Sequence, residues 1–308
     1  MSNHAADSFI HRTSKDSDGD LTRTDGALDQ FLKIGRFLLA LPMLVFPVFH
    51  FIATTFVATI VPPWIPWHVF WTYFCGVTIM GAGALIVFKK HARVPAILLG
   101  IEIFLFVMLI HVFLIFHKPG DPWAAHLLVE GPAGELNNCF KDLGLSGAVF
   151  IFAGTLSESW RTSGRDNILA LGRTIVAVCI IAFSVLHFIY PAFAPGIQPM
   201  FESIAFPIPG HLSWVYLTGA ALLLAGVCML INWQTRLAAT FVGILILVFD
   251  LLTWGPRFPA HPGELAGNWL KDLGVAGGVL ILAGSLPKES LANSWRNLES
   301  QFIKGGRE

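Results

Sequence analysis

The stretch "NCFKDLGLSGAVFIFAG", residues 138–154, decides the fold, because it returns as "NWLKDLGVAGGVLILAG" at residues 268–284. Ten of the 17 aligned positions are identical, and in both copies a Lys-Asp pair stands before a long apolar run. A helix needs about 20 apolar residues to cross a bilayer. The repeated stretch therefore predicts a duplicated protein that is built from membrane-spanning helices.

The composition agrees with a membrane protein. Of the 308 residues, 55% are hydrophobic and only 13% are charged, whereas soluble domains carry about 25% charged residues. The formal net charge is zero, so we expect no nucleic acid as a partner. The apolar composition makes membrane lipid the expected partner. The apolar residues form eight blocks, which predicts an all-α integral membrane protein with eight transmembrane helices. The expected spans are roughly 36–60, 69–88, 94–116, 140–157, 172–192, 212–231, 237–254 and 269–286.

The match between the two halves extends upstream of the quoted stretches. "GRFLLALPMLVFPVFHFI" from Gly35 aligns with "GRTIVAVCIIAFSVLHFI" from Gly172. Four helices are an even number, so both copies have the same orientation, as in a parallel repeat. We therefore expect two tandem four-helix bundles with a polar tail at each end. The expected regions are a disordered cytoplasmic tail at 1–33, units at 34–160 and 170–287, and an amphipathic cytoplasmic tail at 288–308.

The positive charges predict the orientation in the cell membrane. Most of the 20 Lys and Arg residues lie in the two tails and in alternate connections between the expected spans. The opposite set of connections holds only Lys118, Lys141, Arg257 and Lys271. Because positive residues stay on the cytoplasmic side, we expect a multi-pass protein of the cytoplasmic membrane with both termini in the cytoplasm.

The repeated Lys-Asp pairs have two open interpretations. In the first, Asn138 and Asn268 cap the fourth and eighth helices, the aspartates interact with the helix dipoles, and the lysines snorkel to the outer headgroups. In the second, outer loops close over a polar headgroup or a small substrate, with a glutamate just upstream in each copy. The candidate binding residues are then Glu135, Asn138, Lys141, Asp142, Glu264, Asn268, Lys271 and Asp272.

Two histidines are candidate catalytic residues. His50 and His187 occupy equivalent places in the first and fifth expected helices. Ionisable residues at such depth are energetically costly and usually face the interior of a helix bundle. Three roles remain open for the pair: a hydrogen bond to a neighbouring helix, binding of a quinone with proton transfer, or ligation of haem from both sides.

Two acidic residues inside the expected spans break the repeat. Asp250 aligns with Val107, and Glu102 aligns with Leu245. We expect Glu102 to pair with Arg93 near the inner boundary. Asp250 lies deeper and is a third candidate catalytic residue. His111, on the third helix, is the residue that we expect as its partner and as a further binding residue.

Each unit resembles the DoxX/DoxD-like family of four-helix membrane proteins. In the first unit the resemblance rests on Arg36, His50-Phe51, "VPPWIPWHVFW" (61–71), and Gly76 and Gly83. In the second unit it rests on Arg173, His187-Phe188, "PIPGHLSW" (207–214), Gly219 and Gly226, and both units share the Lys-Asp opening of the fourth helix. Some relatives are membrane subunits of oxidoreductases, including thiosulfate:quinone oxidoreductase, and others are assembly or stress-associated proteins.

The resemblance implies a quinone-facing or assembly subunit of a membrane oxidoreductase complex, with a partner subunit. The alternative is a protein that binds or transports a lipid or another small molecule without catalysis. Quinone is therefore the cofactor to consider, ahead of haem. The four cysteines form no CxxC pair, the chain has no closed metal-site spacing, and no Gly-rich nucleotide loop follows a strand. We expect no metal, and a flavin or nicotinamide would come from a partner.

Overall fold

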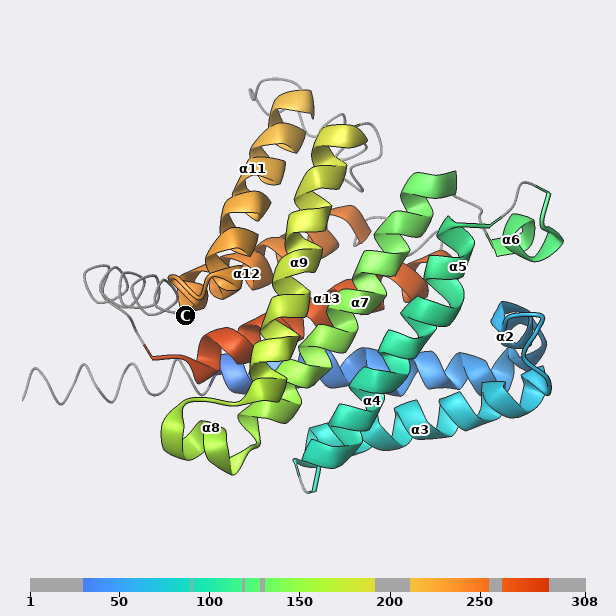
Figure 1. Ribbon diagram of the computed structural model, residues 1–308, viewed down its shortest axis with the longest axis horizontal. Coiled ribbons are helices and arrows are strands. Elements are labelled where there is room, and N and C mark those ends of the chain that lie inside the picture. The colour runs from blue at the N-terminus through green and yellow to red at the C-terminus, as the bar shows by residue number, and fades with distance from the viewer. Residues whose placement is uncertain are drawn as a thin grey trace, which may run out of the picture.

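The computed structural model describes residues 30–89, 91–117, 120–127, 131–191, 211–254 and 262–287, and these residues contain helices and no strand (Figure 1). The expected all-helical fold is confirmed. The described helices are Gln30–Ile52 (the first helix), α2 (Thr54–Ile60), α3 (His68–Phe88), α4 (Arg93–Phe106), the π-helix η1 (Val107–His111), α5 (Val112–Ile115), α6 (Pro122–Leu127), α7 (Gly131–Thr155), α8 (Glu158–Ser163), α9 (Asn167–Ile189), α11 (His211–Leu230), α12 (Thr235–Trp254) and α13 (Pro262–Ser285).

Six of the described helices are long and apolar enough to cross a membrane, which is the architecture of a multi-pass membrane protein. The six are the first helix, α3, the continuous segment Arg93–Ile115, α9, and the segments Leu212–Leu230 and Thr235–Leu252 of α11 and α12. Large apolar side chains such as Phe37, Leu98 and Leu251 are exposed on their outer faces. The two other long helices, α7 and α13, carry the repeated Lys-Asp pairs and are not among the six.

Several helix boundaries differ from the expected ones. The apolar block 36–60 is interrupted at Ala53, where one helix ends and α2 begins. Helix α7 begins at Gly131 and α13 at Pro262, several residues before the expected starts. Asn138 and Asn268 are therefore not N-caps, and the Lys-Asp pairs lie well inside their helices. The helix dipole and the snorkelling lysines do not explain these charges.

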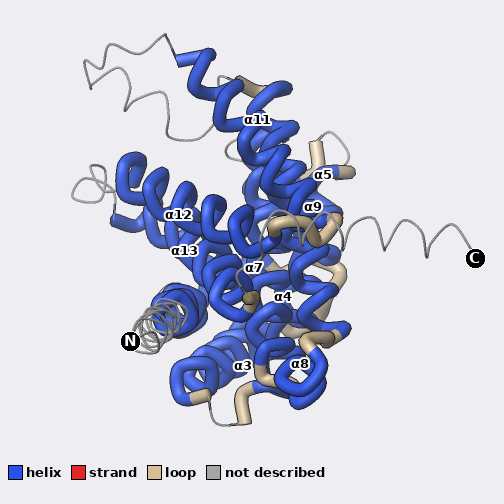
Figure 2. The backbone as a smooth tube through the Cα atoms, turned by 90° about the vertical axis from the view of Figure 1, so that its left-hand side faces the viewer, coloured by secondary structure: helices blue, strands red, loops and turns tan. Residues whose placement is uncertain are grey.

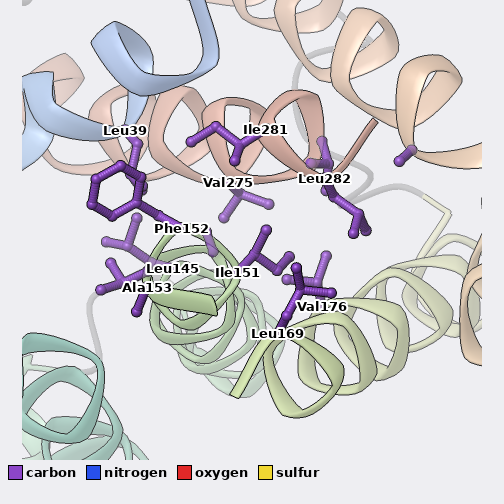
Figure 3. Packing of buried hydrophobic residues seen from close by; sticks show 14 of the residues in the cluster. Leu39, Leu145, Ile151, Phe152, Ala153, Leu169, Val176, Val275, Ile281 and Leu282 are labelled. Carbon is purple, nitrogen blue, oxygen red and sulfur yellow. The ribbon is translucent and has the colours of Figure 1, made fainter. Parts of the chain in front are cut away.

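The core lies where α7 and α13 meet. Helix α7 packs against α4, α9 and α13, and α13 also packs against α12. Figure 3 shows Leu145 and Ile151 of α7 close to Val275 and Ile281 of α13. Every residue from 144 to 154 and from 273 to 284 is buried, and Asp272 is partly buried. The two least apolar long helices are thus the most enclosed ones.

Glycines allow the outer helices to approach this core closely. A Cβ atom added to Gly35 of the first helix would lie 2.6 Å from the carbonyl oxygen of Gly277 in α13. A Cβ atom added to Gly172 of α9 would lie 2.5 Å from the carbonyl oxygen of Gly147 in α7. Small residues are the usual means of close helix contact in lipid. The first described helix therefore contacts α13, while α9 contacts α7.

The figures show the same arrangement. In Figure 1, α7 and α9 run side by side, and α13 crosses behind them beside the blue first helix. Figure 2 shows α12 and α13 side by side at one flank of the molecule. The packing therefore joins the units expected at 34–160 and 170–287 into one structure. Almost all of the expected tail 1–33, apart from the helical residues 30–33, and the expected amphipathic tail 288–308 lie outside the described residues.

Candidate functional site

Two ion pairs cross between the repeated Lys-Asp stretches. Lys141 Nζ on α7 donates to Asp272 Oδ2 on α13 at 2.6 Å. Lys271 Nζ on α13 donates to the Asp142 carboxylate on α7 at 2.9 Å. Only 4% of Lys141 is exposed. Each repeat therefore supplies the counterion for the other repeat's charge. This arrangement needs both copies of the Lys-Asp motif.

His111 links Asp142, a member of these ion pairs, to a further acid, Glu135. Its Nδ1 lies 2.6 Å from Glu135 Oε1, and its Nε2 lies 2.7 Å from Asp142 Oδ2. Because ionised carboxylates only accept hydrogen bonds, both ring nitrogens carry protons and the ring is an imidazolium. His111 is the last residue of the π-helix η1. A π-helix shifts the side chains that follow it around the helix, and such bulges often occur at functional sites.

Asp250 lies near the Lys141–Asp272 ion pair. Only 4% of the residue is exposed, and its Oδ2 atom receives no hydrogen bond from any described group. Its carboxyl group is within hydrogen-bonding reach of Asp272 and close to Lys141. The expected Asp250–His111 contact is wrong, because the two ring nitrogens of His111 bind Glu135 and Asp142. The buried ionic network, as we call it, consists of His111, Glu135, Lys141, Asp142, Asp250, Lys271 and Asp272.

Four other candidate binding residues lie on helices α7 and α13. Glu135 was expected in an outer loop but is a buried residue of α7. Asn138 is a partly buried residue of the same helix. Glu264 and Asn268 lie on α13, but their side chains are outside the described part of the structure. The structure therefore has no described substrate-binding loop made of these four residues.

The expected Glu102–Arg93 pair is also wrong. Glu102 Oε1 accepts a hydrogen bond of 2.8 Å from the Thr78 hydroxyl of α3. Arg93 instead lies 3.1 Å from Asp166 Oδ2, whose other carboxylate oxygen caps α9 by accepting from two backbone amides. Glu102 thus belongs to a separate polar contact between α3 and α4, and not to the buried ionic network.

The two candidate catalytic histidines occupy equivalent surroundings. Nδ1 of His50 donates to the Phe46 carbonyl at 3.1 Å, and Nδ1 of His187 donates to the Phe183 carbonyl at 2.7 Å. Both rings therefore bind their own helix, and neither donates to a neighbouring helix through this nitrogen. A neutral imidazole with its proton on Nδ1 presents Nε2 as an acceptor.

An aromatic pair lies next to each of these histidines. Phe51 and Tyr73 stack with their ring centroids 6.0 Å apart, and Phe188 and Tyr216 stack at 5.8 Å. All four side chains are exposed. Both rings of each pair recur at equivalent positions of the two halves, and this recurrence is the signal in the sequence that indicates the pairs.

The structure does not bring His50 and His187 together. His50 packs against Gly76 of α3, and His187 packs against Gly219 of α11. Figure 1 places the end of the first helix, beside α2, well away from the upper ends of α9 and α11. A single haem held by both rings does not fit this arrangement.

Helix α6 packs against α5, which begins directly after His111. Helix α6 places Trp123 between the α2–α3 connection and α5, where its indole ring contacts Trp64 and Phe113. The Trp123 Nε1 atom also donates to the Thr59 carbonyl at 3.0 Å. Among the described residues, no group of three or more His, Cys, Asp or Glu side chains is arranged to hold a metal ion.

Comparison with protein-family models, with curated proteins and with solved structures found no match.

Proposed function

We propose that this chain is a DoxX-like membrane subunit that binds a quinone for an oxidoreductase partner. The observation that carries this proposal is the repeated combination of an imidazole and an exposed aromatic pair. At each site a histidine Nε2 atom is left to accept a proton, because Nδ1 is bound to a backbone carbonyl. A reduced quinone has a planar ring that stacks on aromatic side chains and hydroxyl groups that donate to such a nitrogen.

The position of the two sites also supports a lipid-soluble ligand. The aromatic rings of both pairs are exposed on helices that are apolar enough to cross a membrane. A molecule dissolved in the bilayer reaches such surfaces without entering the protein interior. We propose that His50 and His187 bind one ligand each and that the electrons pass to or from a partner subunit.

A direct test is to count bound quinone analogues per chain. Binding to the purified protein in detergent can be monitored by the quenching of tryptophan fluorescence. We expect it to saturate at two analogue molecules per chain. His50→Ala and His187→Ala should each remove one site, because each deletes the nitrogen that accepts the ligand hydroxyl. His91→Ala is the matched control, since His91 is exposed in the α3–α4 connection. Unchanged stoichiometry in the variant that lacks both His50 and His187 contradicts the assignment.

A second function, in assembly or in non-catalytic lipid binding, is favoured by a different observation. The ion pairs of the buried ionic network are satisfied within the chain. Such a closed arrangement holds helices together and leaves few charges to bind a substrate. On this alternative the purified protein carries a lipid or another small molecule and transfers no electrons. Mass spectrometry of the co-purified molecules, together with a quinone-reduction assay of the isolated complex, distinguishes the two functions.

We propose further that the chain crosses the cytoplasmic membrane eight times, with α7 and α13 as enclosed spans, and that it is a tandem duplication with both termini in the cytoplasm. The length of α7 and α13, 25 and 24 residues, is sufficient for a crossing. The equivalent glycine contacts of Gly35 and Gly172 support the duplication.

Reporter fusions test this topology. Fusions at residues 125 and 262 are expected on the outer side, because the positive charges place both connections there. A fusion at residue 164, in the connection between α8 and α9, is the matched control and should be cytosolic. A cytosolic signal from either of the first two positions contradicts the eight-span arrangement.

A further inference from the structure

Asp250 is the buried acid that the proposed quinone sites do not use. It is enclosed on α12, one of the six candidate spans, and its Oδ2 atom has no described hydrogen-bond donor. The two groups that face it are Asp272 on α13 and Lys141 on α7. Lys141 already donates to Asp272 Oδ2 at 2.6 Å. Asp250 therefore meets a second acid whose negative charge is already paired.

The other half of the network shows what this position requires. Asp142, the counterpart of Asp272, has Lys271 on one side and His111 on the other, and the imidazolium donates a hydrogen bond to it. His111 comes from the third long helix of the first half, and Asp250 comes from the corresponding helix α12. Asp250 therefore approaches Asp272 from α12 as His111 approaches Asp142 from the corresponding helix, although Asp250 aligns with Val107, four residues before His111. A group that is hydrogen-bonded to an ionised carboxylate has to be the donor, because the carboxylate oxygens only accept hydrogen bonds.

The charge balance leads to the same requirement. The two lysines and the imidazolium of His111 supply three positive charges, and Glu135, Asp142 and Asp272 supply three negative charges. An ionised Asp250 would add an unpaired negative charge in a buried place, which is strongly unfavourable. Two neighbouring carboxylates cannot both stay ionised without a large electrostatic cost. A proton on Asp250 makes the network neutral.

We propose that Asp250 and Asp272 form a proton-binding site, in which the Asp250 carboxyl group donates a hydrogen bond to the Asp272 carboxylate. Asp272 is the more exposed of the two acids, at 19% of its side chain, while Asp250 is buried. We therefore expect the proton to exchange with the surroundings by way of Asp272. The site does not depend on quinone binding.

Infrared spectroscopy tests this site, since a protonated carboxyl group has a C=O stretching band that is separate from carboxylate and amide bands. The full-length protein in detergent micelles at neutral pH is expected to show such a band, with a shift in D2O. Labelling of aspartate with 13C at the side-chain carboxyl group should move the band to lower frequency. This measurement uses the unaltered protein and separates Asp250 from glutamates such as Glu102.

Variants assign the band to the pair. Asp250→Asn, which preserves the shape of the side chain, should remove it. Asp272→Asn should also remove it, because Asp250 then becomes the only acid beside Lys141 and ionises. Asp121→Asn, at an acid that caps α6, is the matched control and should leave the band unchanged. The proposal is overturned if 13C-aspartate shifts no acid band, or if the band survives either Asp250→Asn or Asp272→Asn.

Discussion

Lys141→Met is expected to destabilise the folded protein by about 3–5 kcal/mol, the usual cost of removing one partner of a buried ion pair. The methionine side chain is unbranched and nearly as long as that of lysine, but it leaves the Asp272 carboxylate without its counterion. The loss should appear as a large decrease of the thermal unfolding midpoint in detergent micelles. The double variant Lys141→Met/Asp272→Asn should recover much of it, since the uncompensated charge is then absent.

The matched control for this prediction is Arg93→Met. Arg93 also pairs with an aspartate, Asp166, at 3.1 Å; 41% of the Arg93 side chain is exposed, and Asp166, at 5% exposure, also accepts hydrogen bonds from two backbone amides of α9. Because one partner of this pair is solvent-exposed and the other keeps its backbone hydrogen bonds, the control should lower the unfolding midpoint less than Lys141→Met does. Equal effects of Lys141→Met and Arg93→Met contradict the view that the crossed ion pairs are buried and important for stability.

Gly278→Ala is expected to have the second largest effect, because it separates α7 from α13. A Cβ atom at Gly278 would overlap Ala148 Cβ and lie 2.6 Å from Ala148 Cα. Overpacking in a tight core typically costs about 1–3 kcal/mol. Adding Ala148→Gly removes the nearest atom but not the backbone atom, so the double variant should recover only part of the loss.

Gly81→Ala provides the control for this substitution. Gly81 also lies in a long helix, α3, but a Cβ atom there has nothing within 4 Å. Alanine in a helix is favoured over glycine by about 1 kcal/mol, so this variant should be as stable as the natural protein or slightly more stable. An equal loss of stability in both variants is incompatible with a close α7–α13 contact.

The sequence predicts the helical class well, because long apolar blocks have few other stable structures in lipid. It predicts the starts of α7 and α13 poorly. Asn138 and Asn268 have the chemistry of a helix cap, but the residues before them are helical as well. The same error made Lys141 and Lys271 expected surface residues, because the expected helix starts lay only three residues before each lysine.

The site residues were easier to predict than their partners. Repetition of the Lys-Asp stretch identifies four charges, but the ion pairs join residues that are 129 and 131 positions apart. Nothing in either copy indicates whether a lysine binds within its own half or across. The partners of His111 depend on the π-helix before it, and a local change of helical winding has no clear signal in this sequence.

The crossed pairing has a consequence for biosynthesis. Helix α7 leaves the ribosome before α13, and chain elongation at about 5–20 residues per second separates them by roughly ten seconds. During that delay Lys141 and Asp142 lack their final counterions, so the nascent chain has to shelter them at the insertion machinery or among earlier helices. His111, which is translated before α7, is available to hold Asp142 in the meantime.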